Sequence, residues 1–305
     1  MPESARVDLI DKTRTVKRSH FTVKILLTGA NGMLGHDVSD VLVGRDVTAL
    51  ARKDLDVTDM AAVRAAVAGH DVVINCAAYT KVDDAESNED AAFAVNAIGA
   101  RNLAIAAREV GAKLVQVSTD YVFGGDASEP YAEDSPYAPI SAYGRTKAAG
   151  ERFVRDEYPE GSYIVRTAWL YGEHGPSFPA TMLRLGRERD SVSVVTDQIG
   201  QPTWTHDLAA QLVKLIDSDA PAGIYHGTNA GVASWFEFAK ATFAECDLDP
   251  AKVLPTDSAA FLRPAPRPDF SVLGHKAWAD AGLTPMRDWH EALHDAVGAG
   301  VFGAK

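Results

Sequence analysis

A tyrosine and a lysine near the middle of the chain form the most informative pair in the sequence. In Tyr143-Gly-Arg-Thr-Lys147 the two residues stand four positions apart, so in a helix they lie one turn apart on the same face. The ammonium group there can hold the phenol near its deprotonated form, against a free pKa of about 10. Such a pair is an acid/base that exchanges a proton with a sugar or alcohol oxygen at neutral pH. Tyrosine and lysine are also common on helix surfaces, so the spacing needs support from other motifs.

The segments around this pair alternate between short apolar runs and helical patterns. Strands are predicted at 23–28, 47–50, 71–75, 113–118 and 162–167, and helices at 33–42, 61–67, 91–110 and 141–157. Strands that are apolar throughout and separated by helices indicate a parallel sheet covered on both faces. The predicted fold class is therefore α/β, a doubly wound parallel sheet of the Rossmann type, with ligands beyond the carboxyl ends of its strands.

A glycine-rich turn follows the first predicted strand and opens the first predicted helix. In the run GANGMLG the glycines allow a tight turn, close approach of the backbone to a pyrophosphate, and close packing of the helix on the strand. The alternative is a purely structural turn. The candidate dinucleotide-binding residues of this turn are Gly29, Asn31, Gly32, Met33, Leu34 and Gly35.

The end of the second predicted strand bears on the choice between the two nicotinamide cofactors. An acidic residue there accepts the ribose hydroxyl of NAD, whereas a cation favours the ribose phosphate of NADP. The chain has Arg52 at this point and no carboxylate before Asp54. Arg52 therefore favours NADPH, with NADH left open and a solvated loop as the alternative. Asp56 and Val57 follow where this fold commonly contacts adenine.

Small and hydroxyl-bearing residues end the third and fourth predicted strands. The hydroxyl of Thr119, followed by Asp120, can hydrogen-bond both a substrate carbonyl and the Tyr143 phenol, although structural hydroxyls are common at strand ends. Small side chains after the third strand would let a dinucleotide lie flat across the edge of the sheet. These candidate residues are Cys76, Ala77 and Ala78.

The chain divides at about residue 172, where the alternation ends and prolines break the remainder into short helices and loops. We expect residues 22–172 to form the dinucleotide-binding core. Residues 173–305 are expected to form mainly a substrate-binding lobe, with some segments returning to the core. Residues 1–21 are polar and lack the apolar stretch of a signal peptide, so we interpret them as a mobile extension.

Composition excludes several classes of function. The net charge of −12 argues against nucleic acid as a general partner, because nucleic-acid binding needs a basic face. The chain has no run of eighteen apolar residues, so no membrane span is expected. Two cysteines are too few for a disulfide framework or a zinc site. A cytoplasmic location is predicted.

Together these segments resemble the dTDP-4-dehydrorhamnose reductase family, which belongs to the extended short-chain dehydrogenase/reductases. The resemblance covers about residues 22–300, and the glycine motif is its least specific part. The matching stretches are GANGMLG at 29–35, NCAAYTKVDDAE at 75–86, STDYVF at 118–123, YGRTK at 143–147, RTAWLYG at 166–172, TMLRL at 181–185, DQIGQPT at 197–203 and RPDFSVL at 267–273.

The resemblance implies reduction of the C4 carbonyl of dTDP-4-dehydro-L-rhamnose to dTDP-L-rhamnose by NAD(P)H. Tyr143 would donate the proton, assisted by Thr119 and by Lys147, which would also bind the nicotinamide ribose. Thr119 and Asp120 would contact the sugar. Trp169 would pack against the sugar ring, with a core tryptophan as the alternative.

The resemblance also implies roles for a basic residue and for a metal. Arg267 is a candidate for binding the nucleotide diphosphate, with a plain surface arginine as the alternative. Some members of the family bind Mg²⁺ through glutamates at a dimer contact. The equivalent region here offers Asp37 and His206, so no metal is predicted, and a homodimer is left open.

Three other functions are weighed against this one. A sister reductase of another nucleotide-activated 4-keto deoxysugar, such as the dihydrostreptose branch, would share every catalytic residue. A regulatory subunit that keeps a dinucleotide but has no activity is disfavoured, because Tyr143 and Lys147 are both present. An epimerase or dehydratase holds NAD tightly, and the missing acidic residue after the second strand argues against it.

Overall fold

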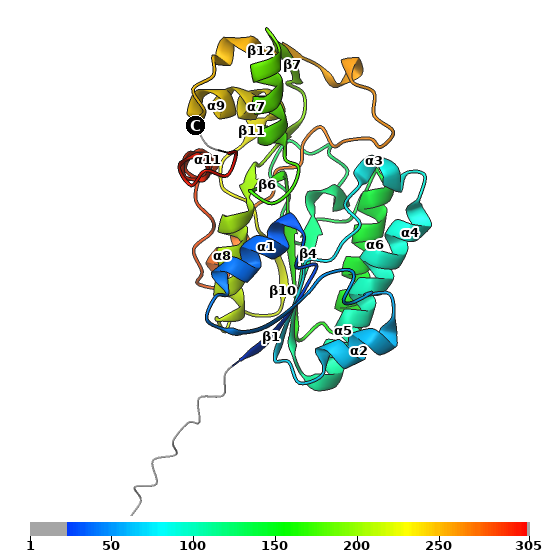
Figure 1. The fold of residues 1–305 in the computed structure, drawn as a ribbon. Helices are drawn as coiled ribbons and strands as arrows, with labels where there is room; N and C mark the ends of the chain where they lie inside the picture. The colour runs from blue at the N-terminus through cyan, green and yellow to red at the C-terminus, as the bar shows by residue number, and fades with distance from the viewer. Residues whose placement is uncertain (1–22, 304–305) are drawn as a thin grey trace, which may run out of the picture.

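A six-stranded parallel sheet forms the centre of this computed structural model, which describes residues 23–303 (Figure 1). In sheet order the strands are β10 (Gly223–His226), β5 (Ser162–Thr167), β4 (Lys113–Thr119), β3 (Val72–Asn75), β1 (Lys24–Thr28) and β2 (Asp46–Leu50). Every neighbouring pair is parallel. The predicted doubly wound fold is confirmed. Its strand order changes direction between β1 and β3, which is where such sheets bind ligands.

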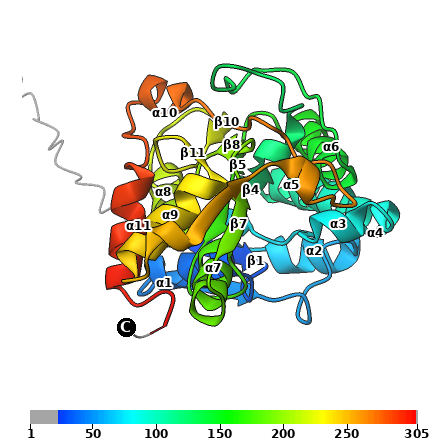
Figure 2. The same cartoon turned by 90° about the horizontal axis from the view of Figure 1, so that it is seen from above.

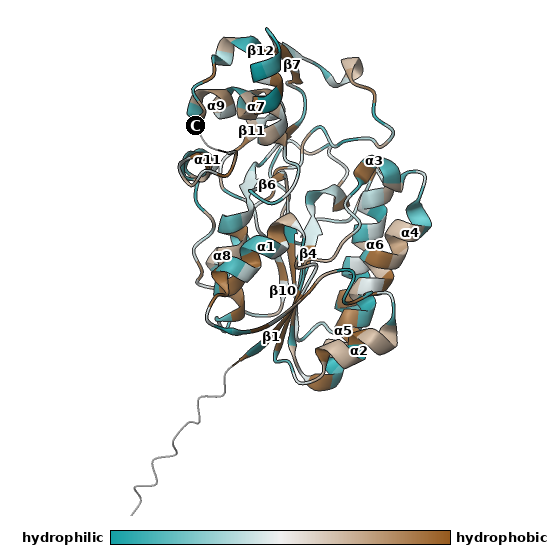
Figure 3. Ribbon diagram, in the orientation of Figure 1, coloured by the Kyte–Doolittle hydropathy of each residue, from teal (hydrophilic) through white to brown (hydrophobic). Residues whose placement is uncertain are grey.

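Helices cover both faces of the sheet. One face carries α1 (Met33–Val41) and α8 (Thr205–Ile216), and the other carries α2 (Met60–Val67), α5 (Ala100–Val110) and α6 (Ala142–Glu157). Successive strand side chains point to opposite faces. Ile25 and Leu27 of β1 therefore pack with α1 and α8, while Leu26 packs with the other three helices. Figure 3 shows the resulting hydrophobic strands between the helices.

The predicted helix at 91–110 contains a π-helical segment. It begins with α4 (Glu89–Phe93), continues through the π-helix Ala94–Gly99 and ends with α5. Asn96, in the π-helix, exchanges two hydrogen bonds with the Tyr79 backbone: its Nδ2 donates to the carbonyl oxygen (3.1 Å) and its Oδ1 accepts from the N–H (2.8 Å). A bulge of this kind often marks a functional site, and the helical periodicity of the sequence does not reveal it.

A smaller lobe lies beyond the carboxyl ends of the strands (Figures 1 and 2). Its strands pair as β6 (Leu170–Tyr171) with β9 (Thr203–Trp204), β7 (Val192–Val195) with β12 (Val253–Thr256), and β8 (Ile199–Gly200) with β11 (Ala233–Ser234). Its main helices are α7 (Phe178–Glu188), α9 (Trp235–Glu245) and α11 (Trp289–Gly298). The shorter elements are α3 (Val82–Ala85), α10 (Lys276–Asp280) and the 3-10 turns Asp120–Val122, Pro250–Lys252 and Ser258–Ala260.

The chain passes between the sheet and the lobe repeatedly. It enters the lobe through α7 and β7, and α8 and β10 then bring it back to the sheet. It returns to the lobe in α9 and β12. Trp278 of α10 packs in the core of the sheet, and α11 ends the path in the aromatic core of the lobe. The strand β10 was not predicted, because its four-residue sequence contains only two apolar side chains.

Two further sequence predictions concern the ends of the chain and membranes. The predicted mobile extension at 1–21 lies outside the described residues. Within 23–303, no helix is both long enough and apolar enough to cross a membrane.

A buried histidine on β10 makes the stability of the fold sensitive to acid. His226 is fully buried, and its ring bonds the Gly274 carbonyl oxygen (2.7 Å) and lies 3.4 Å from the Arg166 guanidinium. Burial, reinforced by the Arg166 charge, lowers the pKa of His226 to about 3. Between this pKa and the unfolded value of about 6.5, the unfolded chain binds a proton that the folded chain does not, so stability falls as pH falls.

We therefore expect His226 to account for about 2 kcal/mol of lost unfolding free energy between pH 7 and pH 5. Urea denaturation at both pH values measures the loss, which should be smaller by that amount in His226→Gln. The exposed His294, paired with Glu245, supplies the control: His294→Gln should keep the wild-type dependence. Equal pH dependence in wild type and His226→Gln would contradict this assignment.

Candidate active site

The glycine turn between β1 and α1 has the geometry of a dinucleotide cradle. Gly29 has φ +69°, and a Cβ there would lie 2.5 Å from the Ala77 backbone nitrogen. A Cβ on Gly35 would lie 2.3 Å from the Gly29 carbonyl oxygen. Gly32 caps α1 without a side-chain hydrogen bond, and the first turn has no acidic residue. The free N–H groups and the helix dipole can therefore receive a pyrophosphate.

The other predicted residues of this turn lie at the start of α1. Asn31 is exposed. Leu34 is buried in the core between the sheet and the helices α1 and α8. Met33 is half-buried and faces the lobe, since a Cβ on Gly172 would lie 3.3 Å from its Cγ. The turn thus lies between the sheet and the segment that leads into the lobe.

The loop after β2 has an exposed arginine, Arg52, close to a carboxylate, Asp54, that is already hydrogen-bonded within the loop. Asp54 accepts a hydrogen bond from the Ala51 N–H (3.1 Å), so its carboxylate serves the loop itself. Arg52 is exposed. Asp56 accepts from the backbone N–H and the hydroxyl of Thr58, and these bonds, with a smaller contribution from the Arg52 charge, lower its pKa. The arrangement suits a phosphate near Arg52 better than a ribose hydroxyl.

A chain of buried hydrogen bonds crosses the carboxyl ends of three strands. The Thr28 hydroxyl donates to Asn75 Oδ1 (2.6 Å), and Asn75 Nδ2 donates to Gln116 Oε1 (2.7 Å). Gln116 Nε2 donates in turn to the Val117 carbonyl oxygen (2.8 Å), which also accepts from Lys147 Nζ (2.7 Å). The chain fixes the relative positions of β1, β3 and β4, and it fixes where the lysine ammonium lies.

The small residues after β3 border this chain. Ala77 donates its N–H to Asn75 Oδ1 (3.0 Å), and Ala78 follows it half-buried. Burial raises the pKa of the Cys76 thiol to about 12, against the opposing charge of Lys147. Cys76 is therefore a neutral thiol beside the ammonium. That residues 76–78 contact a nicotinamide remains a prediction.

The start of α6 brings Tyr143 to the end of β4. The Ser141 hydroxyl caps the helix by accepting the Gly144 N–H (3.1 Å). A Cβ on Gly144 would lie 2.2 Å from the Tyr121 carbonyl oxygen, so only glycine lets the first turn of α6 lie this close to the turn after β4. The rings of Tyr121 and Tyr143 meet edge to face at 5.6 Å, and the Tyr143 phenol hydrogen-bonds Thr119.

The phenol and the ammonium of this pair are both buried, and burial changes the pKa of each. Burial raises the pKa of Tyr143 to about 12, opposed by its hydrogen bond with Thr119. The Lys147 ammonium donates a hydrogen bond to the Val117 carbonyl oxygen (2.7 Å). Burial lowers the pKa of Lys147 itself to about 8. At neutral pH Tyr143 is therefore a protonated phenol, which suits a proton donor.

Asp120 adds a buried carboxyl group next to Tyr143. Its side chain is 2% exposed, and Oδ1 accepts from the Thr119 hydroxyl (2.9 Å). Burial raises its pKa to about 6, against hydrogen bonds with Ser271 and Thr119. Oδ2 has no hydrogen-bond partner among the residues described. A buried polar oxygen of this kind can accept a hydrogen bond from a bound hydroxyl.

Trp169 is strained and already has an aromatic partner. It has φ +46°, which is rare for a bulky side chain, and such strain clusters at functional sites. Its indole stacks on that of Trp235, with centroids 3.6 Å apart, and a Cβ on Gly200 would lie 2.5 Å from the ring. That Trp169 packs against a sugar ring remains a prediction.

Arg267 is held by a carboxylate across the molecule. Its Nη1 bonds Asp83 Oδ1 (2.5 Å) and the Ala265 carbonyl oxygen (2.6 Å). The Arg267 hydrogen bond lowers the pKa of Asp83, and Arg263 lies 3.8 Å away on the same carboxylate. The pair ties α3 to the segment before residue 270. Binding of a diphosphate by Arg267 stays a prediction, and it requires sharing or exchange of the Asp83 contact.

The region of Asp37 and His206 contains a group of possible ligands. Asp37, Asp40 and His174 place one ligand atom each within 4.8 Å of one another. Burial raises the pKa of Asp37, opposed by the neighbouring Thr205 hydroxyl and by the nearby histidines. The prediction that no metal binds here is left as a prediction.

Sequence reasoning missed two groups that touch the predicted site. Asn96 Nδ2 donates to the Thr146 hydroxyl (3.1 Å), next to Lys147 in α6. Glu151 and Arg166 form an ion pair (2.8 Å) in which each side chain is 1% exposed. Glu151 could have been found, because it continues the four-residue spacing of Tyr143 and Lys147.

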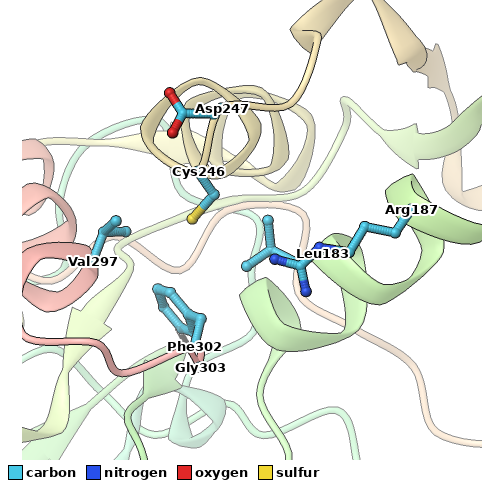
Figure 4. A pocket seen from close by; sticks show the side chains of 7 residues that line it. All are labelled: Leu183, Arg187, Cys246, Asp247, Val297, Phe302 and Gly303. Carbon is cyan, nitrogen blue, oxygen red and sulfur yellow. The ribbon is translucent and has the colours of Figure 1, made fainter. Parts of the chain in front are cut away.

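A pocket elsewhere is separate from these residues. It has a volume of about 130 Å³ and lies in the lobe, where Leu183, Cys246, Val297 and Phe302 line it, with Arg187 also pointing toward it (Figure 4). The predicted site residues do not line it. Pockets for small molecules usually measure about 300 Å³ or more, so this one is smaller than a typical ligand site.

Comparison with known proteins decides the family. The model of the RmlD substrate binding domain matches residues 23–300. The chain belongs to the dTDP-4-dehydrorhamnose reductase family. The dTDP-4-dehydrorhamnose reductase of Streptomyces griseus is 54% identical over 282 residues, which cover 90% of this chain and 93% of that protein. The resemblance inferred from the sequence motifs is thereby confirmed.

Two further proteins that are similar to this chain have names that specify a substrate or a cofactor. A dTDP-4-keto-6-deoxy-D-glucose reductase of Streptomyces niveus is 50% identical, covering 90% of this chain and 96% of that protein. The dTDP-4-dehydrorhamnose reductase of Bacillus anthracis, which has a crystal structure in complex with NADP, is 44% identical in sequence to this chain. It has a TM-score of 0.88 and covers 91% of this chain and 99% of that one.

Proposed function

We propose that this chain reduces the C4 carbonyl of dTDP-4-dehydro-L-rhamnose to the alcohol of dTDP-L-rhamnose, with NADPH as the reductant. The observation that carries this proposal is the position of the buried Tyr143 phenol at the sheet edge that also holds the glycine turn. The proposal is supported by the 54% identity to the S. griseus dTDP-4-dehydrorhamnose reductase and by the NADP complex of the B. anthracis protein.

Tyr143 is proposed as the acid of this reaction. It donates its phenolic proton to the C4 oxygen as negative charge develops there, and the Thr119 hydroxyl beside it helps to hold the phenol in place. A pKa of about 12 keeps the proton on Tyr143 until the oxygen becomes basic enough to take it. Asp120 accepts a hydrogen bond from a hydroxyl of the sugar and so fixes the carbonyl in place.

Lys147 is proposed to support both the acid and the cofactor. Its ammonium stabilises the phenolate that Tyr143 becomes and binds the ribose next to the nicotinamide. A bound NADPH supplies the hydride to C4. Gly29 and Gly35 give the backbone room to approach a pyrophosphate, which the free N-terminus of α1 would receive.

The test is consumption of NADPH in the presence of enzymatically prepared dTDP-4-dehydro-L-rhamnose, with the product identified as dTDP-L-rhamnose. A parallel assay uses dTDP-4-keto-6-deoxy-D-glucose, because the S. niveus relative is named for that substrate. Faster turnover of the glucose-derived ketone would replace the proposed substrate with this second candidate. Cofactor binding with no turnover of either ketone would favour a regulatory subunit.

Arg52 is proposed to select NADPH over NADH by pairing with the ribose phosphate. Arg52→Ala should raise the Kd for NADPH by about tenfold to a hundredfold and change that for NADH less than about twofold, since a charge-assisted hydrogen bond contributes about 1.5–3 kcal/mol. Titration of both cofactors by fluorescence measures the two constants.

The control is Arg64→Ala, since Arg64 is also exposed but pairs with Glu109 on α5. It should leave both dissociation constants unchanged. If Arg52→Ala weakened NADPH and NADH to the same extent, Arg52 would not be the residue that reads the phosphate.

A further inference from the structure

A buried ion pair lies directly behind Lys147. Glu151 follows Lys147 by one turn of α6, and Arg166 lies in β5. Arg166 donates from Nη2 to Glu151 Oε2 (2.8 Å) and from Nε to both carboxylate oxygens (3.1 Å each). Each side chain is 1% exposed. Two full charges are thus held away from water.

Hydroxyl and aromatic groups complete this pair. The Glu151 carboxylate also accepts hydrogen bonds from the hydroxyls of Ser118 and Tyr137, the latter at 3.0 Å. The Arg166 guanidinium lies 4.8 Å from the centroid of the Phe123 ring and donates to the Glu133 carbonyl oxygen (3.0 Å). The pair therefore connects β4, β5 and α6 immediately behind the reacting edge of the sheet.

Stability of the fold does not by itself explain why a buried ion pair is present here. Desolvation of two charges costs several kcal/mol per ion and often cancels their attraction, so apolar residues of the same size commonly serve the fold as well. A lasting negative charge at this place has a different use. It attracts the ammonium of Lys147, which stands one turn earlier on the same face of α6 and is buried like Glu151.

Among the groups around Lys147, Glu151 supplies the carboxylate that attracts its ammonium. The Val117 carbonyl of β4 accepts from the ammonium but carries no net charge. Cys76, after β3, is a neutral thiol, and Tyr143, on the same helix, is a neutral phenol. Of the residues described, Glu151 is the carboxylate whose attraction opposes the desolvation of Lys147.

We propose that Glu151, held by Arg166, is a positioning residue that acts through Lys147 and keeps its ammonium charged at the reacting edge. This role rests on the proposed reduction, in which Lys147 must be positive when Tyr143 gives up its proton. Without Glu151, the same burial favours the neutral amine, which neither stabilises the phenolate nor holds its position.

Two variants test this role. Glu151→Gln removes the charge but leaves Arg166 buried and unpaired, which can prevent folding. The double variant Glu151→Gln/Arg166→Gln removes both charges and restores a neutral, hydrogen-bonding pair of similar size. Glu157→Gln is the matched control, because Glu157 lies on the same helix but pairs with Arg101 near the surface.

Two measurements are made on the full chain of each variant. NMR of isotopically labelled lysine ε-carbons follows the titration of Lys147, whose signal is assigned by its loss in Lys147→Arg. The pH dependence of kcat follows the reaction. We expect the Lys147 midpoint to fall by about one pH unit in the double variant, with the alkaline limb of kcat moving equally. Glu157→Gln should change neither.

The outcomes separate the two proposals. If the double variant folds and Lys147 titrates with the wild-type midpoint, the proposed role of Glu151 is wrong. The role is also wrong if the midpoint falls but the pH dependence of kcat does not change with it. If the wild type binds NADPH but reduces no keto sugar, the proposed function fails. The NMR titration alone then decides whether Glu151 controls the charge of Lys147.

Discussion

Replacing Tyr143 with phenylalanine is expected to lower kcat about a thousandfold. The phenol is the group that protonates the C4 oxygen, and a positioned acid of this kind contributes about a hundredfold to ten-thousandfold. The Kd for NADPH should stay within about twofold, because the phenyl ring keeps its packing against Tyr121. Steady-state kinetics and a fluorescence titration of NADPH measure the two quantities.

Tyr225→Phe provides the control for this variant. Tyr225 donates to the Pro221 carbonyl oxygen (2.6 Å) in the core of the sheet, away from the site. Its loss should leave kcat unchanged. A Tyr143→Phe variant that kept more than about a tenth of the wild-type kcat would contradict this role, because a loss of about tenfold or less is far too small for removal of the main acid. The proton would then have to come from another group.

Gly29→Ala is expected to damage both the fold and the cofactor site. Its positive φ costs about 1–2 kcal/mol for an alanine, and the Cβ would overlap the Ala77 backbone, for a total of about 3 kcal/mol or more. The displaced backbone borders the proposed dinucleotide path, so the Kd for NADPH should rise at least about tenfold. Urea denaturation and cofactor titration test both effects.

Gly69→Ala separates the two causes. Gly69 also has a positive φ (+78°), but nothing lies within 4 Å of a Cβ built on it. Only the backbone strain remains, at about 1–2 kcal/mol, and NADPH binding should be unaffected. Similar losses of stability in both variants would show that the close approach to Ala77 is unimportant.

The sequence predicted the parts of the molecule that local patterns determine. Apolar runs predicted five of the six central strands. Four of these, β1, β3, β4 and β5, are buried on both faces, whereas β2 lies at the edge of the sheet and is largely exposed. The glycine turn was predicted because close approach leaves no other residue type possible at Gly29 and Gly35. Tyr143 and Lys147 were found as a pair because helical spacing alone places them on one face.

The remainder depends on contacts between distant segments. The pKa of Tyr143 follows from burial and from the neighbouring Thr119 hydroxyl. The position of the Lys147 ammonium is set by β4 through the Val117 carbonyl oxygen. The partner of Arg267 is Asp83, 184 residues away. The stacking of Trp169 on Trp235 is likewise a contact across the lobe, and none of these leaves a local pattern in the sequence.

The repeated passage of the chain between sheet and lobe limits how the molecule can change. Strand β10 belongs to the sheet and helix α8 covers one of its faces, yet both come after α7 and β7 of the lobe in the chain. Removal of everything beyond residue 172 would therefore expose the β5 edge and uncover one face of the core. The lobe is thus no detachable module that could be exchanged between relatives. Sugar preference in this architecture has to evolve residue by residue within loops, while the interleaved scaffold stays whole.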